Sequence, residues 1–263
     1  MSDVVELSVE ERVATLTLNR PEVLNTLNDE MAEALKTLTA QVAADDSVRC
    51  LVIQGAGGHF MAGGDIGYFA GCIQIPPAER HAEISRVIEI IHAAIVSLRE
   101  MPKPVVASVS GAVAGFGMSL LAACDLAVAA ENTKFASAYC QLGVSPDGGG
   151  TFFLPRLVGD KRAREIMFLG ERLSVQEALA LGLVNKVVAV GELAAATDAL
   201  VQRLVNGPQQ ALAGSKRLLN QSLNNTLEQQ LLMEQQSFAD CAAATDFEEG
   251  VRAFMEKRTP DFC

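Results

Sequence analysis

One stretch, residues 108–151, limits what this chain can fold into. A β-branched run at 105–109 predicts a buried strand, and Gly115 and Gly117 then let the backbone turn and approach another segment closely. The apolar run at 118–124 predicts a helix that starts directly after this turn. Because a helix N-terminus presents free N–H groups and a partial positive charge, the turn suits a site where negative charge develops.

A second strand and a second glycine turn complete this stretch. Residues 126–130 predict a strand, and the run Ser145-Pro146-Asp147-Gly148-Gly149-Gly150-Thr151 predicts a turn that carries a carboxylate. Strands that alternate with helices favour an α/β fold with right-handed crossovers. We therefore expect an α/β architecture in which a glycine-rich turn holds Asp147.

The rest of the chain predicts further elements of the same class. Asn28 is the expected N-cap of a helix that reaches about Ala44. The other expected elements before residue 193 are a hairpin over 4–18, a strand over 48–54, a loop over 71–77, a helix over 78–100, a helix over 161–169, a short helix opened by a capping box at Ser174, and a strand over 186–190.

The last quarter of the chain predicts helices only. Breaks fall at 206–208, 224–225 and 244–245, and Thr226 and Thr245 are both candidate capping-box residues. We expect the α/β core to span 1–200 and a helical region to span 201–263. The latter contains more leucine than one small core would need, which predicts packing on another subunit.

Composition excludes several classes of protein. A hydrophobic content of 49% and a charged content of 20% are typical of a globular chain with a large core. A net charge of −11 weighs against nucleic acid or an anionic membrane surface as the main partner. We expect neither a signal peptide nor a membrane span, and hence a cytoplasmic location. The spacing of the cysteines and histidines predicts reduced, packed thiols and no metal site.

Three local patterns resemble the enoyl-CoA hydratase/isomerase (crotonase) superfamily. They are Leu18-Asn19-Arg20-Pro21 with 25–28, then Phe60-Met61-Ala62-Gly63-Gly64-Asp65-Ile66, then the central stretch continued through Leu154-Pro155-Arg156. Segments 178–184 and 254–258 extend the resemblance over nearly the whole chain. It implies a spiral of ββα units, a helical C-terminal trimerisation region, assembly as a trimer or a dimer of trimers, and a coenzyme A thioester as substrate with no separate cofactor.

The resemblance also implies an oxyanion hole, made by the backbone N–H groups of Gly64 and Phe116. Many members have glycine where this chain has Phe116, but a backbone donor tolerates the change. Adenosine phosphates are expected near 20–24, with help from Lys257 or Arg258 of a neighbouring subunit. The residues expected to contact substrate are Arg20, Val23, Leu24, Ala62, Asp65, Ile66, Tyr139, Leu142 and Lys257. Those that could line the acyl pocket, or equally belong to the core, are Phe60, Met61, Ile66, Tyr68 and Phe69.

The usual pair of hydratase glutamates is missing. Counting along the family pattern places Ser119 and Tyr139 at those positions, and either side chain could orient substrate or simply pack. Water addition needs one group to activate water and one to protonate carbon, so this departure counts against a simple hydratase. The chain has no tryptophan, which counts against the related aryl-CoA dehalogenases.

Asp147 remains as the candidate acid/base. Some isomerases of the family, those of the 1,2-epoxyphenylacetyl-CoA isomerase type, have an aspartate in the same glycine-rich turn. One carboxylate suffices to shift a double bond. We expect apolar neighbours such as Phe116 and Leu142 to raise its pKa above about 3.9. Asp147 could also be an ordinary turn residue. The first hypothesis is an enoyl-CoA isomerase; the alternatives are a hydratase and a non-catalytic acyl-CoA binder.

Overall fold

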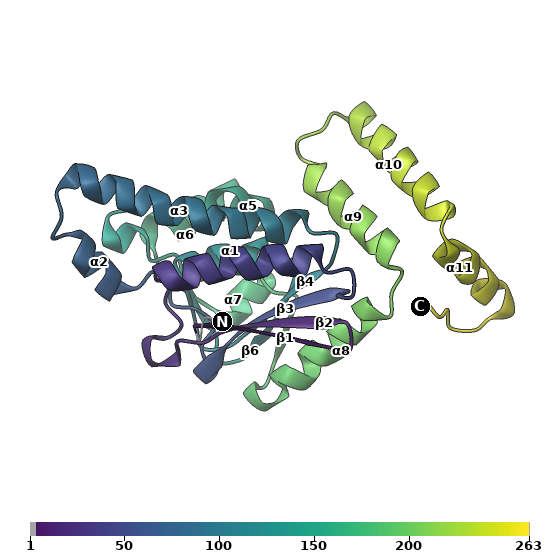
Figure 1. Ribbon diagram of the computed structural model, residues 1–263, viewed down its shortest axis with the longest axis horizontal. Coiled ribbons are helices and arrows are strands. Elements are labelled where there is room, and N and C mark those ends of the chain that lie inside the picture. Colours follow the sequence, from purple (N-terminus) through teal and green to yellow (C-terminus); the bar gives the residue numbers. More distant parts are fainter. Residues whose placement is uncertain (1–3, 263) are drawn as a thin grey trace.

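A six-stranded sheet forms the centre of the molecule (Figure 1). The computed structural model describes residues 4–262. The strands lie in the order β1-β2-β3-β4-β6-β9, in which β1 is antiparallel to β2 and the later pairs are parallel. Their bounds are Val5–Glu10 (β1), Val13–Leu18 (β2), Cys50–Gly55 (β3), Val105–Val109 (β4), Leu126–Ala130 (β6) and Lys186–Val188 (β9). The expected hairpin and the four later strands are confirmed.

Helices cover both faces of this sheet. Those up to residue 205 are α1 (Asp29–Ala44), α2 (Ile66–Cys72), α3 (Pro77–Glu100), α4 (Phe116–Ala123), α5 (Gly150–Val158), α6 (Asp160–Leu169), α7 (Val175–Ala180) and α8 (Leu193–Val205). Figure 1 shows α1 and α3 on one side of the sheet and α8 on the other. The Asn28 side chain accepts from the Met31 N–H at 3.0 Å and caps α1, as the sequence predicts.

The alternation of side chains along a strand decides which helices each residue meets. In β3, Leu51 and Ile53 belong to the main core, together with the buried faces of α1 and α3. Cys50 and Val52 lie on the opposite face and pack with Val201 of α8. Because successive strand residues alternate between faces, a continuous apolar run is what this two-sided sheet requires.

A second, three-stranded sheet holds the segments next to the glycine turns. It consists of β5 (Ala112–Ala114), β7 (Lys134–Ala136) and β8 (Arg172–Ser174), with β5 parallel to β7 and β7 antiparallel to β8. The short 3₁₀ turns are η1 (Pro21–Val23), η2 (Ala56–Gly58), η3 (Cys140–Leu142) and η4 (Val190–Glu192). Helix α4 follows β5 after a single residue, and all of its residues are buried. The turn that leads into α4 is therefore anchored from inside the core.

Three further helices stand beside the core (Figure 1). They are α9 (Gln209–Gln221), α10 (Leu227–Ala242) and α11 (Thr245–Glu256). The buried Lys216 fastens α9 to the core, because its ammonium lies 2.7 Å from Asp125 Oδ2 and donates to the carbonyls of Leu98 and Lys103 at 2.7 and 2.9 Å. None of the helices between residues 4 and 262 combines the length and apolar character needed to cross a bilayer.

The predicted division of the chain falls inside a helix. Residues 193–205 form the single helix α8, which contains the expected boundary after residue 200. Helix α8 packs on the central sheet through Val201 and Val205. The division into 1–200 and 201–263 stays a prediction.

Three smaller expectations are wrong. The segment 71–77 is not wholly a loop, because α2 extends through Cys72. Thr245 does not cap a helix: α11 begins at Thr245 itself, with Ala244 at the cap position and no side-chain hydrogen bond there. Cys140 is exposed rather than packed. For the two helix boundaries, a short pattern is compatible with more than one starting or ending residue, and tertiary packing selects among them.

Candidate active site

The glycine-containing segments 61–64 and 112–117 lie side by side. Met61 and Val113 form a parallel bridge. The Met61 N–H donates to the carbonyl of Ala112 at 3.0 Å, and the Ala114 N–H donates back to the Met61 carbonyl at 2.9 Å. A Cβ on Gly117 would lie 2.3 Å from the Met61 carbonyl oxygen, so only glycine permits this approach. The contact joins residues more than 50 positions apart in the sequence.

The turns place two backbone donors close together. A Cβ on Gly115 would lie 3.4 Å from the Cα of Gly63, so the backbone at Gly63 lies against the backbone at Gly115. The next residue on each segment, Gly64 and Phe116, therefore starts from this point of contact. Phe116 is the first residue of α4, where an N–H has no acceptor within its own helix. Within residues 4–262, neither the Gly64 N–H nor the Phe116 N–H donates a hydrogen bond to the protein. Both donors are available to an oxygen atom.

The Gly64 segment is held from both sides. The Leu27 N–H donates to the Gly63 carbonyl at 2.7 Å, and the Asp65 N–H donates to the Leu27 carbonyl at 2.8 Å. A Cβ on Gly64 would lie 2.6 Å from ring atoms of Phe69, which shows how closely α2 covers this residue. The direction of the Gly64 N–H is therefore set by packing on two neighbouring segments.

The glycine turn at 145–151, which carries Asp147, packs against α4. Gly148 and Gly149 have φ values of 57° and 79°, a region that favours glycine. A Cβ on Gly148 would lie 2.6 Å from the Phe116 ring, and a Cβ on Gly150 would lie 2.7 Å from Ser119 Oγ. The carboxylate-bearing turn, the Phe116 donor and Ser119 thus form one site.

Asp147 is half-buried, and it accepts hydrogen bonds from Ser119 and Tyr139, the residues that we expect at the usual glutamate positions. The Tyr139 hydroxyl donates to Asp147 Oδ1 at 2.7 Å, and the Ser119 hydroxyl donates to the Asp147 carbonyl at 2.8 Å. Burial raises the pKa of Asp147, and the Tyr139 hydrogen bond opposes that shift. Burial, followed by the neighbouring Asp147 charge, raises the pKa of Tyr139. The predicted upward shift for Asp147 is confirmed.

His92 is a site residue that the sequence reasoning missed. Its Nε2 accepts from the Gly148 N–H at 3.3 Å, and a positive charge on its ring would lower the pKa of Asp147. His92 lies on α3, next to the buried Ile91, and 55 positions before Asp147. No local motif marks it, so only its place beside the apolar stripe of α3 could have drawn attention to it.

Comparison with known proteins shows which family this chain resembles. The family profile described as enoyl-CoA hydratase/isomerase matches residues 8–263. A 1,2-epoxyphenylacetyl-CoA isomerase of Escherichia coli is 37% identical over 100% of this chain and 99% of its own length. A crotonyl-CoA hydratase of Syntrophomonas wolfei is 35% identical over 97% of this chain and 96% of its own. The crystal structure of an enoyl-CoA hydratase from Polaromonas sp. JS666 has a TM-score of 0.91 at 37% identity, with 98% of both chains covered.

The chain belongs to the enoyl-CoA hydratase/isomerase family. The resemblance drawn from the sequence is confirmed, and with it the crotonase-like α/β fold. Enzymes of this family act on acyl-CoA thioesters. Relatives are named both as isomerases and as hydratases, so membership alone leaves the reaction open.

Several predicted substrate contacts of this family member lie together near Gly64. Arg20 and Asp65 form an ion pair at 2.8 Å, and Asp65 also caps α2 by accepting from the Gly67 N–H at 2.7 Å. The Ala62 N–H donates to the Leu24 carbonyl at 3.0 Å, and Val23 lies in η1 beside it. The charge of Arg20 is thus already paired within the protein, and its predicted role toward phosphates stays a prediction.

Other predicted contacts are placed differently. Phe60 and Met61 are completely buried and belong to the main core. Ile66 and Leu142 are exposed, by 59% and 50%, so Leu142 is not part of an apolar wall around Asp147 within this chain. Lys257 follows α11, outside the core, and one chain does not bring it to the site.

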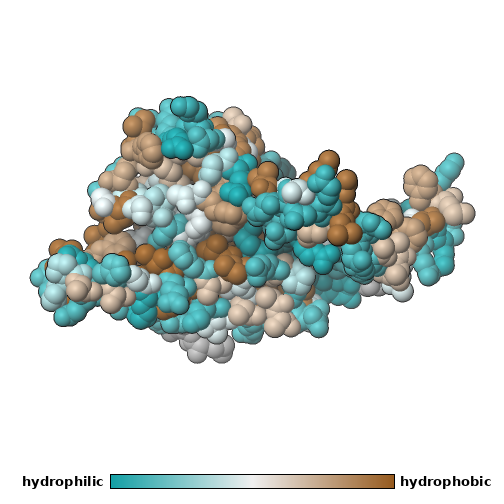
Figure 2. All heavy atoms as spheres, turned by 90° about the horizontal axis from the view of Figure 1, so that it is seen from above, coloured by the Kyte–Doolittle hydropathy of each residue, from teal (hydrophilic) through white to brown (hydrophobic). Residues whose placement is uncertain are grey.

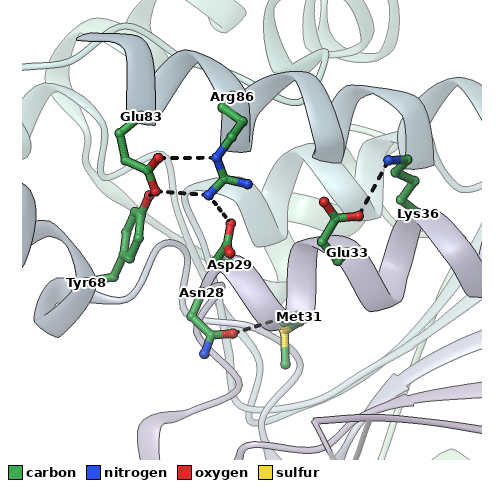
Figure 3. Close-up of polar contacts among 8 residues, drawn as sticks. All are labelled: Asn28, Asp29, Met31, Glu33, Lys36, Tyr68, Glu83 and Arg86. Carbon is green, nitrogen blue, oxygen red and sulfur yellow. Dashed lines mark hydrogen bonds and ion pairs between the residues drawn. The ribbon is translucent and has the colours of Figure 1, made fainter. Parts of the chain in front are cut away.

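Polar side chains link α2 to α3 and α1 (Figure 3). The Tyr68 hydroxyl of α2 donates to Glu83 Oε1 at 2.9 Å. Arg86 binds Glu83 at 2.9 Å and Asp29 of α1 at 2.6 Å. Hydrogen bonds from Arg86 and Tyr68 lower the pKa of Glu83. Because α2 begins directly after Asp65, this cluster restrains the helix that covers Gly64.

Proposed function

We propose that this protein is an enoyl-CoA isomerase that shifts a double bond in an acyl-CoA thioester. The observation that supports it is the position of Asp147, a half-buried carboxylate on a turn that touches Phe116, one of the two available donors. Serine and tyrosine occupy the positions where the family's hydratases carry glutamates. One carboxylate can serve a reaction that removes a proton and returns it.

The proposed reaction follows from the arrangement of donors and carboxylate. The N–H groups of Gly64 and Phe116 would hold the thioester oxygen as negative charge develops on it. The Asp147 carboxylate would take a proton from C2 of a 3-enoyl thioester, which gives a dienolate, and would return that proton to C4. The product is the 2-enoyl thioester, with no net change in atoms or charge. A raised pKa makes the carboxylate a stronger base for this step.

The substrate would be a coenzyme A thioester, and no separate cofactor enters this scheme. Val23, Leu24, Ala62 and Ile66 are the proposed contacts along the thioester, with the adenosine phosphates near Arg20. Lys257 of a neighbouring subunit is a proposed second contact for the phosphates.

Asp147→Asn tests the proposed acid/base. The variant keeps the size and turn-forming capacity of the residue but cannot exchange a proton, so conversion of 3-enoyl to 2-enoyl thioesters should be nearly abolished while thioester binding persists. Ser119→Ala and Tyr139→Phe should reduce the rate far less. Deuterium uptake at the α or γ carbon in D₂O measures the transfer directly. Unchanged uptake in Asp147→Asn would remove this residue from the mechanism.

Hydratase activity is the second candidate, because a relative 35% identical to this chain is named crotonyl-CoA hydratase. In that case Asp147 would activate water instead of receiving a carbon-bound proton. A screen of 2-enoyl, 3-enoyl and ring-epoxide thioesters separates the two reactions by product. Binding of every thioester without turnover would instead identify a non-catalytic acyl-CoA binder.

Gly64→Pro tests the proposed oxyanion hole. Proline removes the N–H donor, and the loss of one such donor typically lowers turnover by about 10²–10³-fold. Circular dichroism and thioester binding report whether the variant folds. A folded Gly64→Pro protein with full activity would show that the oxyanion hole lies elsewhere.

We also propose that the chain assembles as a trimer or a dimer of trimers through its C-terminal helices. Large apolar side chains are exposed there, including Phe238 by 74%, Phe254 by 86% and Met255 by 76%. Figure 2 shows apolar atoms on the part of the molecule that projects from the core. A groove of about 690 Å³, lined by residues of α3, α5, α9 and α10, lies beside these helices. A monomeric mass in sedimentation at micromolar concentration would refute this assembly.

A further inference from the structure

The hydroxyls of Ser119 and Tyr139 form a closed ring of three contacts with two oxygens of Asp147. Ser119 Oγ lies 2.8 Å from the Asp147 main-chain carbonyl, and Tyr139 Oη lies 2.7 Å from Asp147 Oδ1. The two hydroxyl oxygens are 3.1 Å apart. Ser119 is 1% exposed and Tyr139 is 7% exposed, so bulk water does not share these contacts. Hydrogen bonding in the ring must therefore be satisfied mainly from within.

The ring has three contacts, and the number of protons depends on the state of Asp147. A hydroxyl contributes one proton, and a carboxylate contributes none. With Asp147 ionised, two protons are shared among three contacts. If both hydroxyls donate to Asp147, the 3.1 Å contact between their oxygens has no proton between them. One contact of the ring is therefore always unmade in the ionised state.

With Asp147 protonated, the ring can close. The carboxyl group donates to Tyr139 Oη, Tyr139 donates to Ser119 Oγ, and Ser119 donates to the Asp147 carbonyl. Each contact then has one donor and one acceptor, so all three contacts are hydrogen bonds. The change requires only rotation of the Tyr139 O–H bond, because the Ser119 hydroxyl donates to the Asp147 carbonyl in both states, and no heavy atom moves.

We propose that Ser119 and Tyr139 are positioning residues that act as a relay, complete only when Asp147 carries the proton it transfers. This inference rests on the proposed function, since it assigns the proton held by Asp147 to the isomerisation. The relay lets Asp147 alternate between base and acid within a fixed frame of heavy atoms. It gives a physical role to the serine and tyrosine that replace the hydratase glutamates.

The relay predicts a specific change on removal of the serine hydroxyl. Ser119→Ala removes two hydrogen bonds from the protonated state but one from the ionised state. The protonated state loses more, so the pKa of Asp147 should fall, by about half a unit to one unit for one hydrogen bond. In a Tyr139→Phe protein the ring is already open, and Ser119→Ala should then leave the pKa of Asp147 nearly unchanged. This dependence on Tyr139 distinguishes a relay from a packing role.

Apart from Tyr139 itself, the titratable groups near Asp147 are the same in every variant. The titratable groups that face its carboxyl are Tyr139, from the segment after β7, and His92, from α3. Helix α4 contributes the Ser119 hydroxyl. Glu89 lies one turn before His92 on α3 and is exposed. Because none of these charged groups changes in Ser119→Ala, a shift measured between the two proteins reports the serine hydroxyl.

The experiment is a ¹³C-carboxyl NMR titration of aspartate-labelled protein without substrate, with the Asp147 signal assigned by its absence in Asp147→Asn. The four proteins of the cycle are wild type, Ser119→Ala, Tyr139→Phe and the double variant. Ser137→Ala is the matched control, because Ser137 is a buried serine whose hydroxyl contacts Met167 Sδ instead.

The expected result is a downward shift in Ser119→Ala that is absent from the Tyr139→Phe background and from Ser137→Ala. No shift, an upward shift, or an equal shift in both backgrounds would overturn the relay. If Tyr139→Phe does not fold, Ser119→Thr provides the second test, because it keeps the hydroxyl and should leave the pKa of Asp147 near that of the wild type; a shift as large as in Ser119→Ala would overturn the relay. The titration needs no turnover, so its result remains valid even if the thioester screen finds no isomerase activity. Conversely, failure of the relay leaves the isomerase proposal intact.

Discussion

Replacement of Gly148 by alanine should disturb the site and the core together. Gly148 is buried with φ of 57°, and its N–H donates to His92 Nε2 at 3.3 Å. An added Cβ would lie 2.6 Å from two carbon atoms of the Phe116 ring and 3.0 Å from Ser119 Cβ. Carbon atoms normally approach to about 3.5–4.0 Å, so either the turn or the ring must move.

Two terms contribute to the expected loss of stability. A left-handed conformation costs a residue other than glycine about 1–2 kcal/mol. Overpacking of a dense core typically costs a further 1–3 kcal/mol or so. A combined cost of about 3 kcal/mol lowers Tm by about 6–12 °C in a chain of this size. Turnover should fall as well, because the same ring belongs to the residue whose N–H is a proposed oxyanion donor.

Gly143→Ala is the matched control. Gly143 has φ of 70°, close to that of Gly148, but a Cβ there would meet nothing within 4 Å. It should show the conformational cost alone, about 1–2 kcal/mol, and unchanged turnover. Differential scanning calorimetry of both variants and the wild type provides the comparison. Equal losses of Tm in the two variants would refute the packing argument at Gly148.

Three further predictions concern other parts of the molecule. Lys216→Met should destabilise the protein by about 3–5 kcal/mol, because it removes the charge partner of Asp125 and a donor to two buried carbonyls. An unchanged midpoint of urea unfolding would contradict this. Burial raises the pKa of Asp147, so the stability that this carboxyl contributes at acid pH is lost as pH rises through its folded pKa. Asp147→Asn should therefore gain stability relative to wild type as pH rises from about 4 to 7. A difference in Tm that does not depend on pH would contradict this sign. Tyr68→Phe removes the donor to Glu83 and should speed amide hydrogen exchange in α2 with little change in Tm; unchanged exchange would mean that the polar cluster does not restrain this helix.

Much of the fold could be predicted from local patterns. The apolar run at 105–109 became the central strand β4, and Asn28, Ser174 and Thr226 cap helices as expected. These features depend on residues within one turn or one strand, where backbone geometry and side-chain spacing are directly coupled. The error at Thr245 shows the limit of such patterns, since a capping motif fits more than one starting residue.

The same distinction between local patterns and tertiary packing applies to the candidate site. The sequence by itself determined that Gly64, Phe116 and Asp147 lie on glycine-rich turns, because glycine is favoured where φ is positive or another segment approaches the backbone closely. Only the tertiary structure decided that His92, Ser119 and Tyr139 meet at the Asp147 turn. Those contacts join α3, α4 and the segment after β7, and they depend on how whole helices and sheets pack, which spacing along the chain does not encode.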